Sequence, residues 1–123
     1  MEYNSFEDMT VWQKAMDLAV KIYSLTDRLP RKEDFSLTSQ IRDSGLSVSG
    51  NISEGFGRKH TKDKIKFYYN ARGSLAETKS HLIYGHKVGY FTATELREFS
   101  NLIKEIWKEL NSLINSLTKK SQP

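Results

Sequence analysis

Cysteine is absent from the 123 residues of this chain. Its absence excludes a disulfide framework and thiolate metal ligands, and it is usual for proteins of a reducing compartment. The first ten residues, MEYNSFEDMT, carry acids where a secretory signal needs basic residues. No apolar run approaches the ~18 residues that would span a membrane. We therefore expect a soluble, cytoplasmic protein without a membrane partner.

Proline is also scarce, occurring only as Pro30 and Pro123. A proline inside a helix removes a hydrogen bond and clashes with the preceding turn, so long stretches of this chain are free to be helical. The length suits one domain with its own core. We find no internal repeat and no linker. The sequence predicts a single domain over residues 1–118, followed by a frayed polar tail at 119–123.

The first and last helical segments have the plainest apolar patterns. The first begins at TVWQ, where Thr10 would cap the helix and Gln13 would complete a capping box. It ends before Pro30, which disfavours a helical residue in front of it. The last begins at TATE, where Thr92 and Glu95 have the capping-box spacing.

The apolar side chains of the last segment recur every three or four residues: Leu96, Phe99, Ile103, Ile106, Leu110, Leu113 and Leu117. A sustained seven-residue repeat favours helices that cross at about 20°. With short connections, it predicts an all-α, antiparallel, up-down-up-down four-helix bundle.

Small residues distinguish the two middle helical segments. The second segment would begin after Ser36 and contains SVSGNISEGFG, in which small side chains let a neighbouring helix come close. Gly55 and Gly57 would end it in the left-handed conformation. Thr61 would cap the third segment, and Gly89 would close it.

Some apolar residues of the last segment lie off its main stripe, namely Leu102, Trp107 and Ile114. A single bundle seam does not need them, and surplus apolar surface is typical of subunit contacts. We therefore expect a closed homo-oligomer.

Positive charge gathers in the second half of the chain. Residues 1–57 hold six Lys/Arg against nine Asp/Glu, whereas residues 58–123 hold thirteen against six. The densest run is RKHTKDKIK at 58–66, at the turn before the third helical segment. Backbone N–H groups at a helix start and long basic side chains both reach phosphate. The candidate nucleic-acid-binding residues are Arg58, Lys59, Lys62, Lys64 and Lys66. The alternative is a solvated loop whose charge serves solubility.

Asn51 and Glu54 lie one helical turn apart and invite two interpretations. We favour burial between helices with hydrogen bonds to neighbouring groups, because buried polar groups must be satisfied. The alternative is a polar ligand site. No nucleophile with an adjacent base lies near them in the sequence, so we expect no catalytic residues and no enzyme.

Metal and cofactor sites are not expected. A di-iron bundle needs Glu-x-x-His motifs, and this chain has none. Glu77 and His81 are four apart, which favours an ordinary surface or interface contact. Several aromatic residues could stack on nucleic-acid bases, but aromatic residues at helical spacing more often belong to the core or to a subunit interface, which we favour. These residues are Phe67, Tyr68, Tyr69, Tyr90 and Phe91.

Three stretches occur in the order typical of one family: FEDMTVWQKA, LPRKEDFSLTSQIRDSGLSVSGNISEGFGR and FYYNARGSLAE, followed by GY. The chain resembles the 23S rRNA intervening-sequence proteins, a family of small bacterial four-helix-bundle proteins. The likeness covers nearly the whole chain. The residues that match the family pattern at its usual spacing are Pro30, Glu33, Leu37, Gln40, Ile41, Arg42, Ser47, Asn51, Ile52, Glu54, Gly55, Gly57, Arg58, Ala71, Gly73, Ser74, Leu75 and Glu77. Gly45 and Gly50 depart from this pattern, since better helix formers are common at these positions. Each glycine lowers the stability of its helix by up to ~1 kcal/mol.

The resemblance implies a four-helix bundle that assembles as a ring of five, without enzyme activity. A distant relative is the accessory protein of diversity-generating retroelements, a pentamer that binds nucleic acid and a reverse transcriptase. We therefore expect either association with RNA or DNA through a basic surface, or a protein-interaction scaffold without direct nucleic-acid binding.

Overall fold

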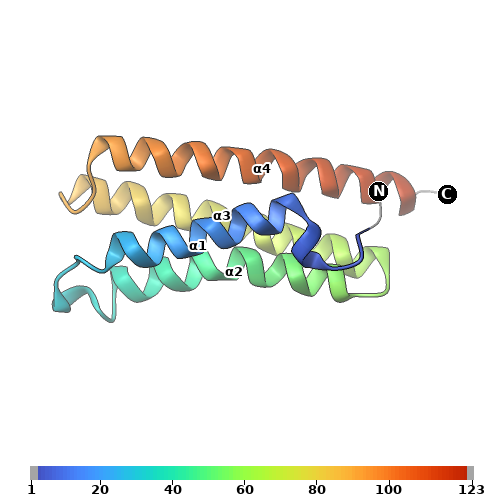
Figure 1. Cartoon of the computed structure of the whole chain (residues 1–123), viewed down its shortest axis with the longest axis horizontal. Coiled ribbons are helices and arrows are strands. Elements are labelled where there is room, and N and C mark those ends of the chain that lie inside the picture. Colours follow the sequence, from blue (N-terminus) through green and yellow to red (C-terminus); the bar gives the residue numbers. More distant parts are fainter. Residues whose placement is uncertain (1–2, 122–123) are drawn as a thin grey trace.

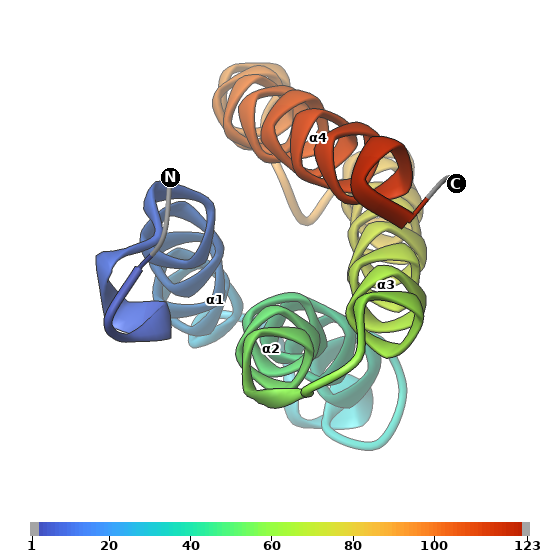
Figure 2. The ribbon, with the colours of Figure 1, turned by 90° about the vertical axis from the view of Figure 1, so that its right-hand side faces the viewer.

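The computed structural model describes residues 3–121, and all regular structure within them is helical. Two short 3-10 turns, η1 (Phe6–Asp8) and η2 (Arg31–Glu33), accompany four long helices: α1 (Thr10–Thr26), α2 (Leu37–Gly57), α3 (Thr61–Lys87) and α4 (Ala93–Ser121). Successive long helices run in opposite directions (Figure 1). Viewed along the bundle, they follow one another around the core in chain order (Figure 2). The structure confirms the all-α class and the four helices, and ring assembly stays a prediction.

The core consists mainly of aliphatic side chains from all four helices. The largest fully buried ones are Leu18, Ile22, Ile41, Val48, Ile52, Leu75, Leu82, Ile106 and Leu110. Ile114 was expected off the stripe of α4, but it is 2% exposed and belongs to this core. Leu102 is half-buried and Trp107 is 37% exposed, so these two do carry surplus apolar surface.

The predicted capping box of α1 is wrong. Met9 precedes the helix and Thr10 is already helical. Because η1 lies against the start of α1, the Gln13 side chain donates to the Glu7 carbonyl oxygen at 2.8 Å. The Thr10 hydroxyl instead donates to Glu109 Oε1 of α4 at 2.6 Å.

Side-chain caps of α2 and α3 also differ from the prediction. Ser36 does precede α2, but its hydroxyl donates to Glu33 Oε1 at 2.7 Å, and that carboxylate accepts the Leu37 N–H at 3.4 Å. Thr61 is the first residue of α3 rather than its cap, and no side chain caps this helix start. The sequence pattern located these starts within a residue but assigned the wrong hydrogen bonds.

Gly55 and Gly57 do not adopt the left-handed conformation that was predicted for them. Both are helical, and among the described residues only Gly89 has a positive φ, at 93°. A Cβ on Gly55 would lie 2.7 Å from Tyr68 Cε1, so this glycine is needed where α3 packs closely on α2. Gly89 does close α3 as expected, with the Tyr90 N–H donating to the Gly85 carbonyl oxygen at 2.8 Å.

Hydroxyl groups line the contact between α2 and α3. The Thr78 hydroxyl donates to Ser44 Oγ at 2.9 Å, and the Ser47 and Ser74 hydroxyl oxygens are 2.9 Å apart. Such short side chains let the two helix axes approach while these four hydroxyl oxygens keep partners. This helix contact therefore explains the small polar residues Ser44 and Ser47 of α2.

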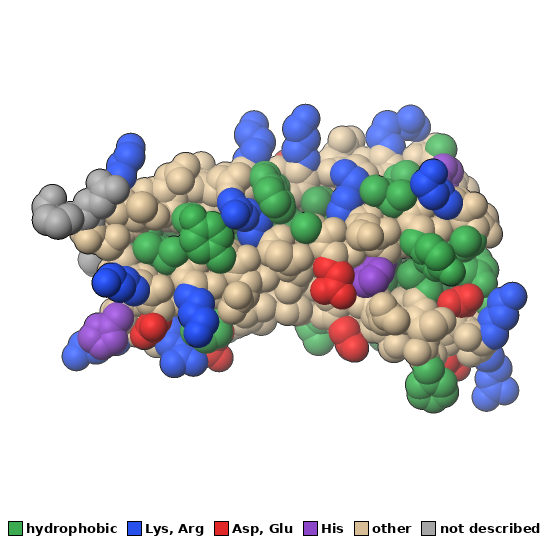
Figure 3. Space-filling view, turned by 180° about the vertical axis from the view of Figure 1, so that it is seen from behind, with side chains coloured by type: hydrophobic (Ala, Val, Ile, Leu, Met, Phe, Trp, Pro, Cys, Tyr) green, Lys and Arg blue, Asp and Glu red, His purple; other side chains and the backbone are tan. Residues whose placement is uncertain are grey.

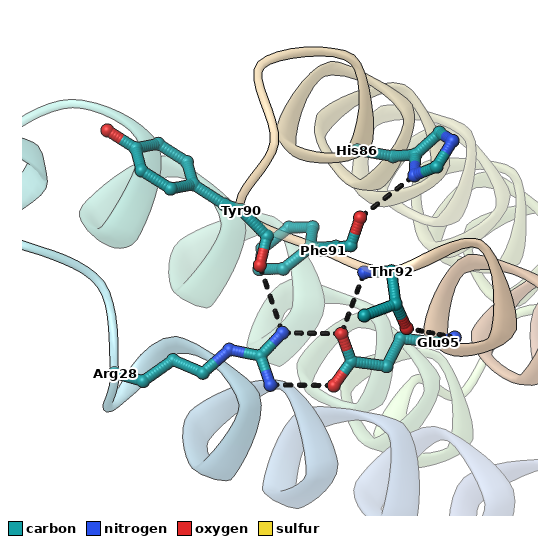
Figure 4. A network of polar contacts seen from close by, with 6 residues as sticks. All are labelled: Arg28, His86, Tyr90, Phe91, Thr92 and Glu95. Carbon is teal, nitrogen blue, oxygen red and sulfur yellow. Dashed lines mark hydrogen bonds and ion pairs between the residues drawn. The ribbon is translucent and has the colours of Figure 1, made fainter.

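A polar network ties the end of α1 to the turn between α3 and α4 (Figure 4). Arg28 pairs with both carboxylate oxygens of Glu95 and donates to the Tyr90 carbonyl oxygen at 3.0 Å. The predicted capping box of α4 is confirmed: the Thr92 N–H donates to Glu95 Oε1 at 2.9 Å and the Glu95 N–H donates to Thr92 Oγ1 at 3.1 Å. The hydrogen bond from Arg28 holds the pKa of Glu95 at about 2.

Both ends of the described chain lie at the opposite end of the bundle from this network (Figure 1). The part of the expected polar tail that the structure describes is helical, because α4 continues to Ser121, while residues 122–123 lie outside the described range. Across residues 3–121, every helix is too short or too polar to cross a membrane.

Candidate nucleic-acid interface

The basic segment 58–66 lies at the turn from α2 into α3. Lys59, Lys62 and Lys66 are exposed. Arg58 is held more firmly: its Nε donates to Glu54 Oε2 at 3.1 Å, and its guanidinium lies 4.7 Å from the centre of the Phe67 ring. These four side chains project from one end of the bundle.

Lys64 is placed differently from the other four. Its ammonium donates to the Phe56 carbonyl oxygen at 2.7 Å and to the Gly55 carbonyl oxygen at 3.3 Å. These are among the last carbonyl groups of α2, which have no partner within their own helix. Burial lowers the pKa of Lys64. Lys64 therefore ties the start of α3 to the end of α2, whereas Arg58, Lys59, Lys62 and Lys66 are exposed.

Asn51 and Glu54 do not form a common buried site. Asn51 is half-buried, and its amide donates to the carbonyl oxygen and the hydroxyl oxygen of Ser47, both at 2.9 Å. Glu54 was expected to be buried, but its side chain is 51% exposed and pairs with Arg58. The expectation is wrong for Glu54 because it lies on the outer face of the last turns of α2.

The carboxylates of α4 face α1, which sequence reasoning missed. Lys14 of α1 pairs with Glu109 and lies 3.5 Å from Glu105, and Arg28 pairs with Glu95. Three of the six acidic residues in the basic half of the chain, residues 58–123, are thus paired with cations from residues 1–57. Seen from behind, Lys and Arg side chains line the edge formed by α4 and gather at the α2–α3 end, while most acids in this view lie lower, toward α2 (Figure 3).

A groove runs between α3 and α4 on the basic side of the molecule. It has a volume of about 400 Å³ and is lined by Ala76, Lys79, Ser100, Asn101, Ile103, Lys104 and Trp107. Beside it, the Arg72 guanidinium lies 4.8 Å from the centre of the Tyr69 ring and 5.1 Å from the centre of the Trp107 ring. Its Nη1 donates to Asn111 Oδ1 at 2.8 Å. In the sequence, the signal for this groove was the position of Trp107 off the apolar stripe of α4.

The other predicted positions are ordinary contacts. His81 Nε2 and Glu77 Oε2 are 3.3 Å apart, and within residues 3–121 no cluster of three or more His, Asp or Glu has the arrangement of a metal site. Of the singled-out aromatic residues, Tyr68 and Phe91 are buried, and the Tyr90 hydroxyl donates to Glu33 Oε2 at 2.8 Å. Tyr69 differs, with 46% of its surface exposed.

Both the sequence and the fold of this chain match known proteins. The family model described as 23S rRNA-intervening sequence protein matches residues 7–112. The chain is similar to a crystal structure from Bacteroides thetaiotaomicron, described as a protein with unknown function from the S23 ribosomal protein family. That structure is 28% identical, with a TM-score of 0.77 over 85% of this chain and 98% of that chain. No curated protein matches the chain. The chain belongs to the 23S rRNA-intervening sequence protein family.

Proposed function

We propose that this protein is a non-enzymatic, oligomeric helical bundle of the cytoplasm that associates with RNA or DNA through phosphate contacts. The observation that supports this proposal is the sorting of charge between the two halves of the bundle. Because Glu105 and Glu109 face Lys14 of α1, and Glu95 faces Arg28 just after α1, they do not neutralise the basic side chains at the outer surface of α3 and α4. A surface of one sign attracts a polyanion and favours backbone contacts that are independent of base sequence.

The experiment measures affinity for a 20-nucleotide single strand, a duplex and a structured RNA at several salt concentrations. Log affinity should fall linearly with log salt, because each neutralised phosphate releases condensed counterions. Replacing Lys62 and Lys66 with glutamine should flatten this slope by about 1 to 2. The matched control replaces Arg31 and Lys32, two exposed cations of η2, and should leave the slope unchanged.

Lys64→Gln provides a second control within the same basic segment. Loss of the bonds to the α2 carbonyl groups should lower stability by about 1 kcal/mol. The salt slope should change little, because the Lys64 ammonium is already directed at α2. If the unmodified protein retains none of the three nucleic acids at about 50 mM salt, where electrostatic attraction is strong, the proposal is wrong.

The alternative function is a protein-interaction scaffold. Exposed apolar side chains favour it: Phe35 is 97% exposed, Tyr84 is 53% exposed and Val88 is 49% exposed. A partner such as a reverse transcriptase, as bound by the distant relative, would use such a surface. Retention of a protein partner by a chain that binds no nucleic acid would support the scaffold.

A further inference from the structure

We propose that the groove between α3 and α4 is a binding subsite for single-stranded nucleic acid, in which a base stacks on Trp107 while neighbouring phosphates meet Lys79 and Lys104. This inference rests on the proposed function and specifies the form of nucleic acid and the place where it binds. At about 400 Å³, the groove falls within the roughly 300–1,000 Å³ typical of sites that enclose small organic groups.

The two sides of the groove have complementary chemistry for a nucleotide. Ile103, Ala76 and Trp107 supply apolar surface, and Lys79 of α3 and Lys104 of α4 supply positive charge. The side chains of Ser100 and Asn101 add hydrogen-bonding groups. A flat apolar base beside a charged phosphate requires this combination.

The charges of the groove are not neutralised by the protein. No carboxylate lines it, and neither Lys79 nor Lys104 takes part in an ion pair among residues 3–121. Glu105 directly follows Lys104, but successive helical residues are about 100° apart, and Glu105 turns toward Lys14 of α1. An anionic occupant is therefore favoured over a neutral one.

Trp107 is held in place although it is 37% exposed. Arg72 lies over its ring and over that of Tyr69, and the bond to Asn111 fixes the guanidinium. Aromatic side chains and arginine planes are the surfaces on which unpaired bases stack, whereas bases inside a duplex expose only their edges. The groove consequently fits a single strand rather than a duplex.

The test uses Trp107 as its own reporter. The chain has two tryptophans, and Trp12→Phe leaves Trp107 as the single one. Titration of this variant with a 12-nucleotide oligothymidylate should quench the Trp107 emission. An abasic oligomer of the same length and charge should bind about 5- to 100-fold more weakly and leave the emission unchanged.

Lys79→Gln with Lys104→Gln should weaken binding of the oligothymidylate, whereas Arg31→Gln with Lys32→Gln should have little effect. Trp107→Leu should reduce affinity for the oligothymidylate to that of the abasic oligomer, with the helical signal and oligomer size retained. Because the base-carrying and abasic oligomers are compared on the unmodified chain as well, the test does not depend on the folding of this variant.

Three outcomes would overturn the inference. Equal, salt-sensitive binding of both oligomers without a change in Trp107 emission would leave the proposed function standing but exclude stacking in this groove. Emission that changes when the protein is diluted, and not with oligonucleotide, would assign the groove to a contact with a second copy of the chain. Absence of binding to any nucleic acid would reject the proposed function together with the subsite.

Discussion

Gly85 and Gly73 both lie on α3, yet a methyl group would meet different surroundings at the two positions. At Gly85 it would lie 2.2 Å from Phe91 Cε2, whereas at Gly73 nothing lies within 4 Å. The same contrast applies on α2, where a Cβ on Gly45 would lie 2.8 Å from Ile22 Cδ1 and one on Gly50 would meet nothing. Gly45 therefore has a packing reason for departing from the family pattern, whereas none is visible for Gly50.

Alanine substitutions should separate these two kinds of glycine. Gly73→Ala and Gly50→Ala should each stabilise the fold by about 0.5 to 1 kcal/mol, because alanine loses less conformational entropy in a helix. Gly85→Ala should destabilise it by about 1 to 3 kcal/mol, because the Phe91 ring must move. Urea denaturation measures all three. Equal effects at Gly73 and Gly85 would contradict the packing account.

Asn51 and Glu54 should also respond differently to alanine. Asn51→Ala should cost about 1 kcal/mol, because the Ser47 carbonyl and hydroxyl oxygens lose a donor. Glu54→Ala should cost no more than about 0.5 kcal/mol, because its pair with Arg58 is exposed. Thermal denaturation of both variants measures this difference. A larger loss of stability for Glu54→Ala would show that its carboxylate has a role beyond this pair.

At the scale of elements, the network of Figure 4 joins α1 to the start of α4 across the α3–α4 turn. Arg28 holds the pKa of Glu95 at about 2 in the folded protein, below its ordinary value of 4.5. The folded state therefore takes up the proton less readily than the unfolded chain. The stability that this pair contributes is complete above about pH 4.5 and is lost as the pH falls toward 2.

Glu95→Gln should consequently lower stability at pH 7 by about 1 to 2 kcal/mol, a figure reduced for solvent screening of the half-exposed Arg28. The difference between the variant and the unmodified protein should shrink as the pH falls from 4.5 to 2. Urea denaturation across this range measures it. Glu98→Gln serves as the control and should show neither effect, because Glu98 is an exposed carboxylate of the same helix that takes part in no ion pair with any residue of 3–121.

At the scale of the whole molecule, apolar surface remains outside the single bundle. A groove between α1 and α4 is lined in part by Val20, Leu25, Phe99 and Leu102, and Val20 is 57% exposed. Together with Phe35, Tyr84 and Val88, it gives the chain more apolar surface than its own helices cover. Such surface is typical of contacts between subunits.

Light scattering after size exclusion should therefore give a multiple of the chain mass of 14.2 kDa, with five subunits favoured by the family resemblance. Val20→Asp should reduce the oligomer size without loss of helix, because the side chain is mainly outside the core. Asn115→Asp, an exposed substitution on α4, should not. A monomer across micromolar concentrations of the unmodified protein would contradict this prediction.

The sequence by itself determined the helices, their order and most of the core. Apolar residues at spacings of three and four locate the helix faces whatever the partner, and the Thr92–Glu95 capping box and Gly89 are local signals that need no other element. At Thr10 the local signal failed because a distant group competed. Thr10 would cap α1 in isolation, but Glu109, far along the chain, takes its hydroxyl hydrogen.

Only the tertiary structure decided which charges remain available to a partner. In the sequence Lys64 is equivalent to Lys62 and Lys66, and packing alone directs it at the α2 carbonyl groups. Likewise, the carboxylates of α4 are interspersed with its lysines in the sequence, and they face α1 because the antiparallel packing brings Lys14 and Arg28 beside them. Net charge is a sum over residues, whereas a charged surface depends on which side chains the fold turns toward one another.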